Sequence, residues 1–196
     1  MPIYRIQHSY PLTQYQKSLL AHKITVLHST EFLTPSLFVN VHYVPGEPVS
    51  DFFLAGKPYN RGLTSPNRIM GTVRTGPKRT KERFDAFAKQ LEAAWYEVVN
   101  GPKEEGQANG RGSVNGHGGE VSKEERLARK LHIVGFTPVI GGLENGVLLP
   151  SADNEATWLK DNMAFFKEQA ELYDDEPFQN LLQELKERPD LRKLVE

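Results

Sequence analysis

The second residue of the chain, Pro2, has the type and position of an acid–base group. We expect Met1 to be removed because the residue after it is small, which leaves Pro2 as the amino terminus with a secondary amine. An unperturbed α-amine has a pKa of about 7.7–8.0, and a hydrophobic pocket or neighbouring cations lower it. Most proteins with proline here carry no chemistry on it, but Pro2 directly begins a segment that alternates like a strand.

Two arginines form a second candidate group. Arg74 ends a predicted strand, and Arg79 follows five residues later at the start of a predicted helix. Backbone N–H groups converge on an anion at such a junction, and a guanidinium group binds a carboxylate through two parallel hydrogen bonds. The pair predicts either a carboxylate site or, together with Lys78, a solvated basic turn.

His28 and Glu144 each have an ordinary and a functional interpretation. His28 closes a predicted helix, where a cation suits the negative end of the helix dipole, or it donates a hydrogen bond to an anionic substrate. Glu144 lies in the glycine-flanked turn 141–146, where it is either an ordinary turn residue or an acidic residue of a functional site. The histidines lack metal-ligand spacing and no phosphate-cradling loop is present, so we expect neither a metal nor a cofactor.

Two similar blocks, about 66 residues apart, place these side chains. In residues 2–45 a strand at 2–8, a helix capped by Thr13 and a strand at 38–44 follow one another. In residues 67–137 a strand at 67–74, a helix capped by Thr80, a charged helical segment at 122–130 and a strand at 131–136 repeat that order. Each crossover helix returns its second strand parallel to the first. The fold class is therefore α/β in the α+β sense, a tandem β-α-β duplication whose four-stranded mixed sheet has two helices on one face.

Three further segments surround the blocks. Seven of the 16 glycines fall within 101–119, which predicts a flexible insertion at about 100–121 because so little apolar surface can be buried there. The run 52–56 is expected to add a hairpin or an edge strand. Residues 1–150 form the main domain, and 151–196 form a helical extension whose apolar stripe predicts packing on the sheet or on a neighbouring subunit.

The overall composition excludes several classes of protein. Among 196 residues, 24 Lys and Arg face 25 Asp and Glu, a balance that favours no nucleic acid partner and no membrane surface. With no cysteine, disulfides, thiolate metal sites and cysteine nucleophiles are excluded. No apolar run approaches the roughly 20 residues of a membrane span, and no signal peptide is visible, so we expect a cytoplasmic protein.

In their order along the chain, these features resemble the tautomerase superfamily, in its cis-3-chloroacrylic acid dehalogenase-like group and the fungal-type branch of oxalocrotonate tautomerases. The resemblance rests on Pro2, Leu12-Thr13, Ile24-Thr25 with His28, Phe38-Val39-Asn40-Val41, Gly56, Arg74, Arg79-Thr80, Glu144, Pro150, and Glu155 with Trp158. It implies a tautomerase/MIF-like fold in which Pro2 is the catalytic amine, Arg74 and Arg79 bind the substrate carboxylate, His28 assists them and Glu144 positions or activates water.

Two departures from the family pattern affect the expected reaction. The second arginine follows Arg74 after a longer gap than in the family, so Lys78 or Arg79 holds the place of the second carboxylate-binding residue. Phe136 stands where the family has a catalytic tyrosine, while Tyr4 is retained. Because a phenyl ring cannot polarise water, we expect keto–enol tautomerisation of a 2-keto acid. The alternatives are hydration, dehalogenation or decarboxylation of a three-carbon acid, and a catalytically weak binding or assembly protein.

The resemblance also implies a homotrimer acting on a small carboxylate substrate. The predicted sheet has helices on one face, so its other face is expected to carry Ile, Val, Phe and Tyr side chains that threefold association would bury.

Overall fold

The predicted sheet is present in the computed structural model, which describes residues 2–59, 65–104 and 122–196. Its strands are β1 (Ile3–Gln7), β2 (Asn40–Val44), β5 (Asn67–Val73) and β6 (Leu131–Pro138), in the order β2-β1-β5-β6. β1 and β2 are parallel, β5 and β6 are parallel, and β1 and β5 are antiparallel at the centre. The tandem β-α-β arrangement and its mixed sheet are therefore confirmed.

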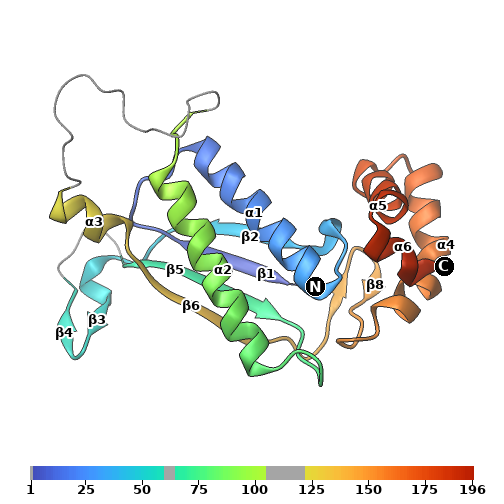
Figure 1. Ribbon diagram of the computed structural model, residues 1–196, viewed down its shortest axis with the longest axis horizontal. Coiled ribbons are helices and arrows are strands. Elements are labelled where there is room, and N and C mark those ends of the chain that lie inside the picture. The colour runs from blue at the N-terminus through green and yellow to red at the C-terminus, as the bar shows by residue number, and fades with distance from the viewer. Residues whose placement is uncertain (1, 60–64, 105–121) are drawn as a thin grey trace.

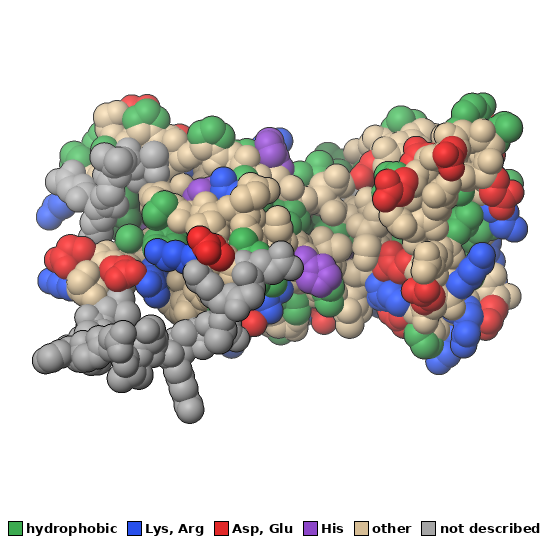
Figure 2. Space-filling model, turned by 90° about the horizontal axis from the view of Figure 1, so that it is seen from above, with side chains coloured by type: hydrophobic (Ala, Val, Ile, Leu, Met, Phe, Trp, Pro, Cys, Tyr) green, Lys and Arg blue, Asp and Glu red, His purple; other side chains and the backbone are tan. Residues whose placement is uncertain are grey.

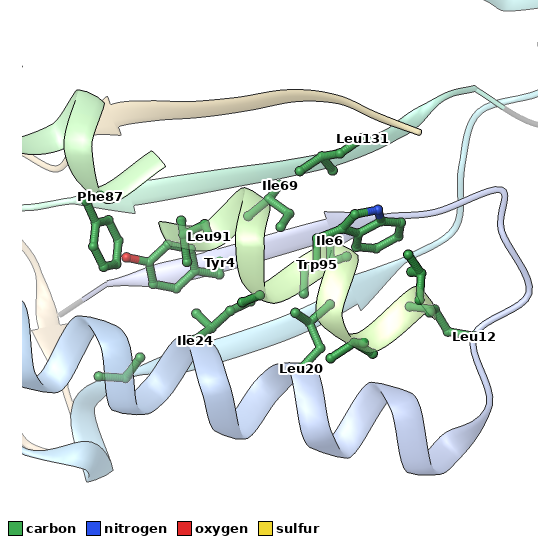
Figure 3. Close-up of a cluster of buried hydrophobic side chains, with 14 of the residues drawn as sticks. Tyr4, Ile6, Leu12, Leu20, Ile24, Ile69, Phe87, Leu91, Trp95 and Leu131 are labelled. Carbon is green, nitrogen blue, oxygen red and sulfur yellow. The ribbon is translucent and has the colours of Figure 1, made fainter. Parts of the chain in front are cut away.

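Two helices, α1 (Gln14–Phe32) and α2 (Lys81–Asn100), cover one face of this sheet (Figure 1). Both begin as predicted, because the hydroxyl of Thr13 accepts a hydrogen bond from the Gln16 N–H and that of Thr80 accepts one from the Arg83 N–H. Strand alternation directs one set of side chains toward the helices, where they form the main core (Figure 3). That core includes Tyr4, Ile6, Leu20, Ile24, Ile69, Phe87, Leu91 and Trp95.

The other face of the sheet differs from the expectation of an apolar surface. Ile3 and Ile133 are 41% and 44% exposed there, but Arg5 and His42 are exposed on the same face. Tyr4, Ile6 and Val73 lie on the helix side instead, because strand alternation places them there. The open face is thus mixed in polarity.

Shorter elements connect the main ones. The 3-10 helices η1 (Ser36–Phe38) and η2 (Val49–Asp51) flank β2, and β3 (Phe53–Leu54) pairs with β4 (Lys57–Pro58). The run 52–56 therefore forms a hairpin outside the main sheet rather than an edge strand. The charged segment forms α3 (Lys123–Arg129), capped by Ser122. Most of the predicted insertion, 105–121, lies outside the described residues.

The last part of the chain forms a helical lobe beside one end of the sheet (Figures 1 and 2). After the hairpin of β7 (Leu143–Glu144) and β8 (Val147–Leu148) come α4 (Glu155–Glu171), α5 (Glu176–Glu187) and α6 (Pro189–Val195). Their buried side chains form a second core together with Phe38 and Val147. None of the described helices is both long and apolar enough to cross a membrane.

Candidate active site

The topology brings the candidate residues toward one end of the sheet. Ile3 of β1 lies opposite Thr72 of the antiparallel β5, so Pro2, which precedes β1, and Arg74, which follows β5, leave the sheet at the same end. The parallel β2 begins there as well, directly after the carboxyl end of α1 and η1. Residues far apart in the sequence therefore share one region.

Pro2 is buried at this end and is linked to Glu144 through Asn40. The Pro2 carbonyl accepts a hydrogen bond from the Asn40 backbone N–H at 3.0 Å. The Asn40 side-chain amide donates to Oε1 of Glu144 at 2.7 Å. Burial raises the pKa of Glu144, although the Asn40 bond opposes that shift. Asn40 therefore connects the Glu144 carboxyl group, whose pKa burial raises, to the backbone of Pro2.

A tight turn aims Glu144 toward the sheet. Asn145 and Gly146 have φ values of 49° and 84°, the left-handed pair that a two-residue β-hairpin requires. A Cβ atom on Gly146 would lie 2.9 Å from Cζ of Phe165 in α4, so only glycine fits. The Trp158 indole N–H donates to the Leu148 carbonyl at 2.7 Å. The helical lobe therefore holds the hairpin that carries Glu144.

His28 is a neutral core side chain, not a cation at a helix end. α1 continues to Phe32, and His28 is 1% exposed. Burial, together with the charges of Arg79 and Arg74, lowers the pKa of His28 well below 6.5. The interpretation of His28 as a helix-end cation is wrong because the helix is one turn longer than the sequence indicated.

Tyr4 determines which nitrogen of His28 carries the proton. The Tyr4 hydroxyl lies 2.6 Å from Nδ1 of His28, and burial raises the pKa of Tyr4 so that the phenol keeps its proton. If the phenol donates to Nδ1, the neutral imidazole carries its own proton on Nε2, whereas in the other tautomer Nε2 is an acceptor. Nε2 is buried and has no partner among the described residues. His28 thus presents an unused polar atom, which is an N–H donor when Tyr4 donates to Nδ1.

Arg74 and Arg79 are buried beneath the surface of their turn. Their side chains are 5% and 2% exposed, and both Nη2 groups bind Oε1 of Glu155, the Arg74 group at 2.9 Å. The interpretation as a solvated basic turn is wrong for both arginines and holds only for Lys78, which is exposed. Arg79, not Lys78, therefore shares the counter-ion of Arg74.

The arginines and His28 lie close enough to interact electrostatically. The Arg79 guanidinium stacks 4.9 Å above the centre of the Phe32 ring, and the His28 ring lies 4.7 Å from the same ring. Burial and then the charge of Arg74 lower the pKa of Arg79 to about 10, while burial also lowers that of Arg74. Both remain cations at neutral pH, so the region holds two guanidinium charges, paired with Glu155 and Asp153, beside a neutral imidazole.

Phe136 packs in the main core, in register with Tyr4 across Gly71. Its ring lies 5.0 Å from that of Phe84 and 6.0 Å from that of Phe87, both in α2. Gly71, opposite Tyr4 in the sheet, leaves room for Tyr4 and Phe136, since a Cβ there would lie 2.9 and 3.0 Å from their rings.

A cleft of about 260 Å³ opens beside the arginines. Arg74 is the one candidate residue in its lining, which otherwise comes from the turn 75–77 and the segments 139–141 and 149–152. Pro2, His28 and Glu144 do not line it. The cleft therefore leads to Arg74, not to Pro2.

Sequence reasoning assigned no role to three polar residues at this end of the sheet, although Asn40 and Glu155 are among those that carry the family resemblance. Asn40 carries a weak signal, since asparagine is depleted in strands. Asp153 and Glu155 precede and begin a helix, where acidic residues are common, so their pairing with arginines about 75 positions away has no local signal. Among the described residues, no group of three or more His, Asp or Glu side chains is arranged to hold a metal ion.

Comparison with protein families gives one match. A family described as "Putative oxalocrotonate tautomerase enzyme" matches residues 1–163, which include all the candidate residues and the start of the helical lobe. Among curated protein sequences, none matches the chain.

Several solved structures are similar to this chain. N1, a member of the cis-3-chloroacrylic acid dehalogenase family, aligns with a TM-score of 0.52 and 17% identity, over 91% of this chain and 99% of N1. Native fused 4-OT aligns at 0.46 and 14% identity, over 74% and 94% of the two chains. MIF2 of Leishmania major aligns at 0.44 and 14%, over 76% and 97%. At this identity, the likeness to N1 shows a shared fold.

Proposed function

We propose a function from the premise that the chain belongs to the oxalocrotonate tautomerase family, in the cis-3-chloroacrylic acid dehalogenase-like group of the tautomerase superfamily. In this proposal the protein catalyses keto–enol tautomerisation of a small 2-keto acid, with Pro2 as its acid–base group. The observation that carries the proposal is the convergence of buried Pro2, the Tyr4–His28 pair and two buried arginines at one end of the sheet. Once Met1 is removed, the Pro2 nitrogen is a secondary amine in a region with two fixed cations.

The proposed reaction moves one proton and leaves the protein unchanged. The neutral amine of Pro2 takes the proton from the enol hydroxyl while the C–O bond gains double-bond character. The resulting prolinium returns that proton to the substrate carbon, so no net proton is gained or lost. Burial favours the neutral amine, and hence its action as a base near neutral pH.

In this proposal the substrate carboxylate binds beside Arg74 and Arg79. Nε of Arg74 is buried and has no acceptor among the described residues, and the same holds for Nε2 of His28. These two N–H groups are the donors available for a carboxylate or for the developing enolate oxygen. Donors that are fixed before the reaction stabilise developing charge more strongly than water does.

Hydration or dehalogenation of a three-carbon acid is the second candidate, and the Asn40–Glu144 hydrogen bond favours it because it fixes a carboxyl group near Pro2. The phenyl ring of Phe136 disfavours it, because a missing acid–base group costs about 10²–10⁴-fold. Phe136→Tyr should raise turnover of 3-haloacrylates more than turnover of enol acids. Brisk 3-haloacrylate turnover by the wild-type protein without tautomerase activity would reverse this ranking.

We also propose a homotrimer, in which the open face of the sheet faces other copies. Ile3 and Ile133 on that face are 41% and 44% exposed and would be buried by threefold association. Sedimentation at micromolar concentration should show a trimer, whereas a stable monomer would contradict this part of the proposal.

The central experiment compares the natural amino terminus with an extended one. Ketonisation of enol acids should fall by about 10²–10⁴-fold when a short peptide precedes Pro2, because an acylated nitrogen has no basicity. Intact mass should show that the active protein begins at Pro2. Full activity of the extended protein would rule out the amine mechanism, and lack of activity in both forms would favour a binding or assembly protein.

A further inference from the structure

The position between the two arginines is already occupied by a carboxylate of the chain itself. Glu155, the first residue of α4, has a side chain that is 10% exposed, and its Oε1 binds both guanidinium groups. Asp153 lies nearby, with Oδ1 3.8 Å from Nε of Arg79. Two cations and two anions therefore meet at the point where the helical lobe contacts the sheet.

This pairing leaves the arginines with few free donors. Nη1 of Arg74 faces the carbonyls of Pro150 and Ser151 at 3.4 and 3.3 Å, and Nη2 of Arg79 donates to the Phe32 carbonyl at 3.2 Å. Within the described part of the chain, Nε of Arg74 remains a buried donor without an acceptor. The site therefore offers hydrogen-bond donors for one ligand carboxylate, next to the carboxylate of Glu155, which stays in place.

The buried charges set a limit on the charge of a ligand. Removing one partner of a buried ion pair is costly because the other charge stays desolvated, so Glu155 is expected to remain in place when a ligand binds. A second carboxylate on the ligand would then be repelled by Glu155 and Asp153 across a region that screens charge poorly. The two cations and two anions already balance, so one ligand carboxylate adds one uncompensated negative charge and a dicarboxylate adds two.

We propose that Glu155 is a specificity-determining residue, which holds Arg74 and Arg79 in position and restricts the site to acids with a single negative charge. The inference rests on the proposed function, since it assumes that the arginines bind the substrate carboxylate.

The test compares two acids of similar size, propionate with one charge and malonate with two, at about pH 8, well above the pKa of a carboxylic acid. Dissociation constants are measured by NMR titration of the full chain, which requires no turnover. In Glu155→Gln the ratio of the malonate to the propionate constant should fall at least tenfold. Asp153→Asn should lower the same ratio less, because Asp153 is farther from the arginines and makes no hydrogen bond to Arg79.

Glu184→Gln is the matched control. Glu184 also lies in the helical lobe, is 16% exposed and accepts hydrogen bonds from Ser36, but it pairs with Arg188 rather than with Arg74 or Arg79. The ratio of the malonate to the propionate dissociation constant in Glu184→Gln should equal that of the wild type. If Glu155→Gln strengthens the binding of both acids equally, Glu155 competes with any carboxylate for the arginines. If neither dissociation constant changes while the protein unfolds more easily, Glu155 only stabilises the fold. Either result overturns the inference.

Arg74→Ala separates this inference from the proposed function. Weaker binding of both acids in Arg74→Ala, with an unchanged ratio in Glu155→Gln, would overturn the role of Glu155 alone. Unchanged binding of both acids in Arg74→Ala would overturn the carboxylate site itself, and with it the inference.

Discussion

The two β-α-β repeats share their elements and their threonine helix caps, yet they place polar groups in different parts of the unit. In the first repeat, Tyr4 on the strand and His28 late in the helix form a neutral hydrogen-bonded pair inside the core. In the second repeat, the strand residue opposite Tyr4 is Gly71, and the charged groups Arg74 and Arg79 lie in the turn between strand and helix.

This difference shows how a duplicated backbone produces one site rather than two. The central strands are antiparallel, so the start of the first repeat and the strand–helix turn of the second repeat meet at one end of the sheet. The amine and the neutral donors come from the first repeat, and the cations come from the second. Each repeat therefore supplies a group that the other lacks.

The largest expected effect is on the cations of the second repeat. Arg74→Ala should lower kcat/KM for enol acids by about 30- to 1000-fold, because a charge-assisted contact worth about 2–4 kcal/mol is lost in the transition state. Steady-state kinetics on folded protein checks this. Arg83→Ala is the control, since Arg83 stacks on the same Phe32 ring but pairs with Glu31. Equal kinetics for both variants would place the carboxylate elsewhere.

A smaller effect, on the free energy of unfolding, is expected at Gly71 of the second repeat, which leaves space for the Tyr4 ring of the first. Gly71→Ala should destabilise the protein by about 1–3 kcal/mol, because the added methyl would press on the rings of Tyr4 and Phe136. Urea unfolding measures this change. Gly141→Ala, where no atom lies within 4 Å of the new Cβ, should change stability little. Equal stability in the two variants would show that the core accommodates the methyl.

The neutral pair of the first repeat should contribute less than the arginines. Tyr4→Phe removes the donor to Nδ1 of His28, so the proton is no longer fixed on Nε2, and we expect a loss of about tenfold in kcat/KM, equivalent to about 1.4 kcal/mol. Tyr43→Phe is matched to it, because the Tyr43 hydroxyl also donates inside the first repeat, to the Lys17 carbonyl. A similar loss in Tyr43→Phe would mean that the effect is structural.

The smallest effect is the pH dependence that His28 gives to stability. Burial lowers the pKa of His28, so between its folded value and about 6.5 the unfolded chain binds more protons than the folded protein. The free energy of unfolding should therefore fall as the pH drops below about 6.5. This slope should be shallower in His28→Gln than in His22→Gln, which changes an exposed histidine of the same helix. Identical slopes would mean that His28 titrates normally.

Local patterns in the sequence were sufficient for the elements and for several candidate residues. Strand alternation, the threonine caps and the order of the two blocks predicted the sheet and its helices, because these depend on contacts between near neighbours. Pro2, Arg74 and Arg79 were visible because their types suit one chemistry at one place in an element.

The tertiary structure decided which groups face one another. Three contacts join residues that are 24 to 104 positions apart. They are the ion pairs of buried Arg74 and Arg79 with Glu155, the hydrogen bond between Asn40 and Glu144, and the hydrogen bond between Tyr4 and neutral His28. Those pairings depend on strand register, on one additional turn of α1 and on the packing of the helical lobe against the end of the sheet. Desolvation and long-range charge act only after the chain has folded, and no local pattern of residue types encodes them.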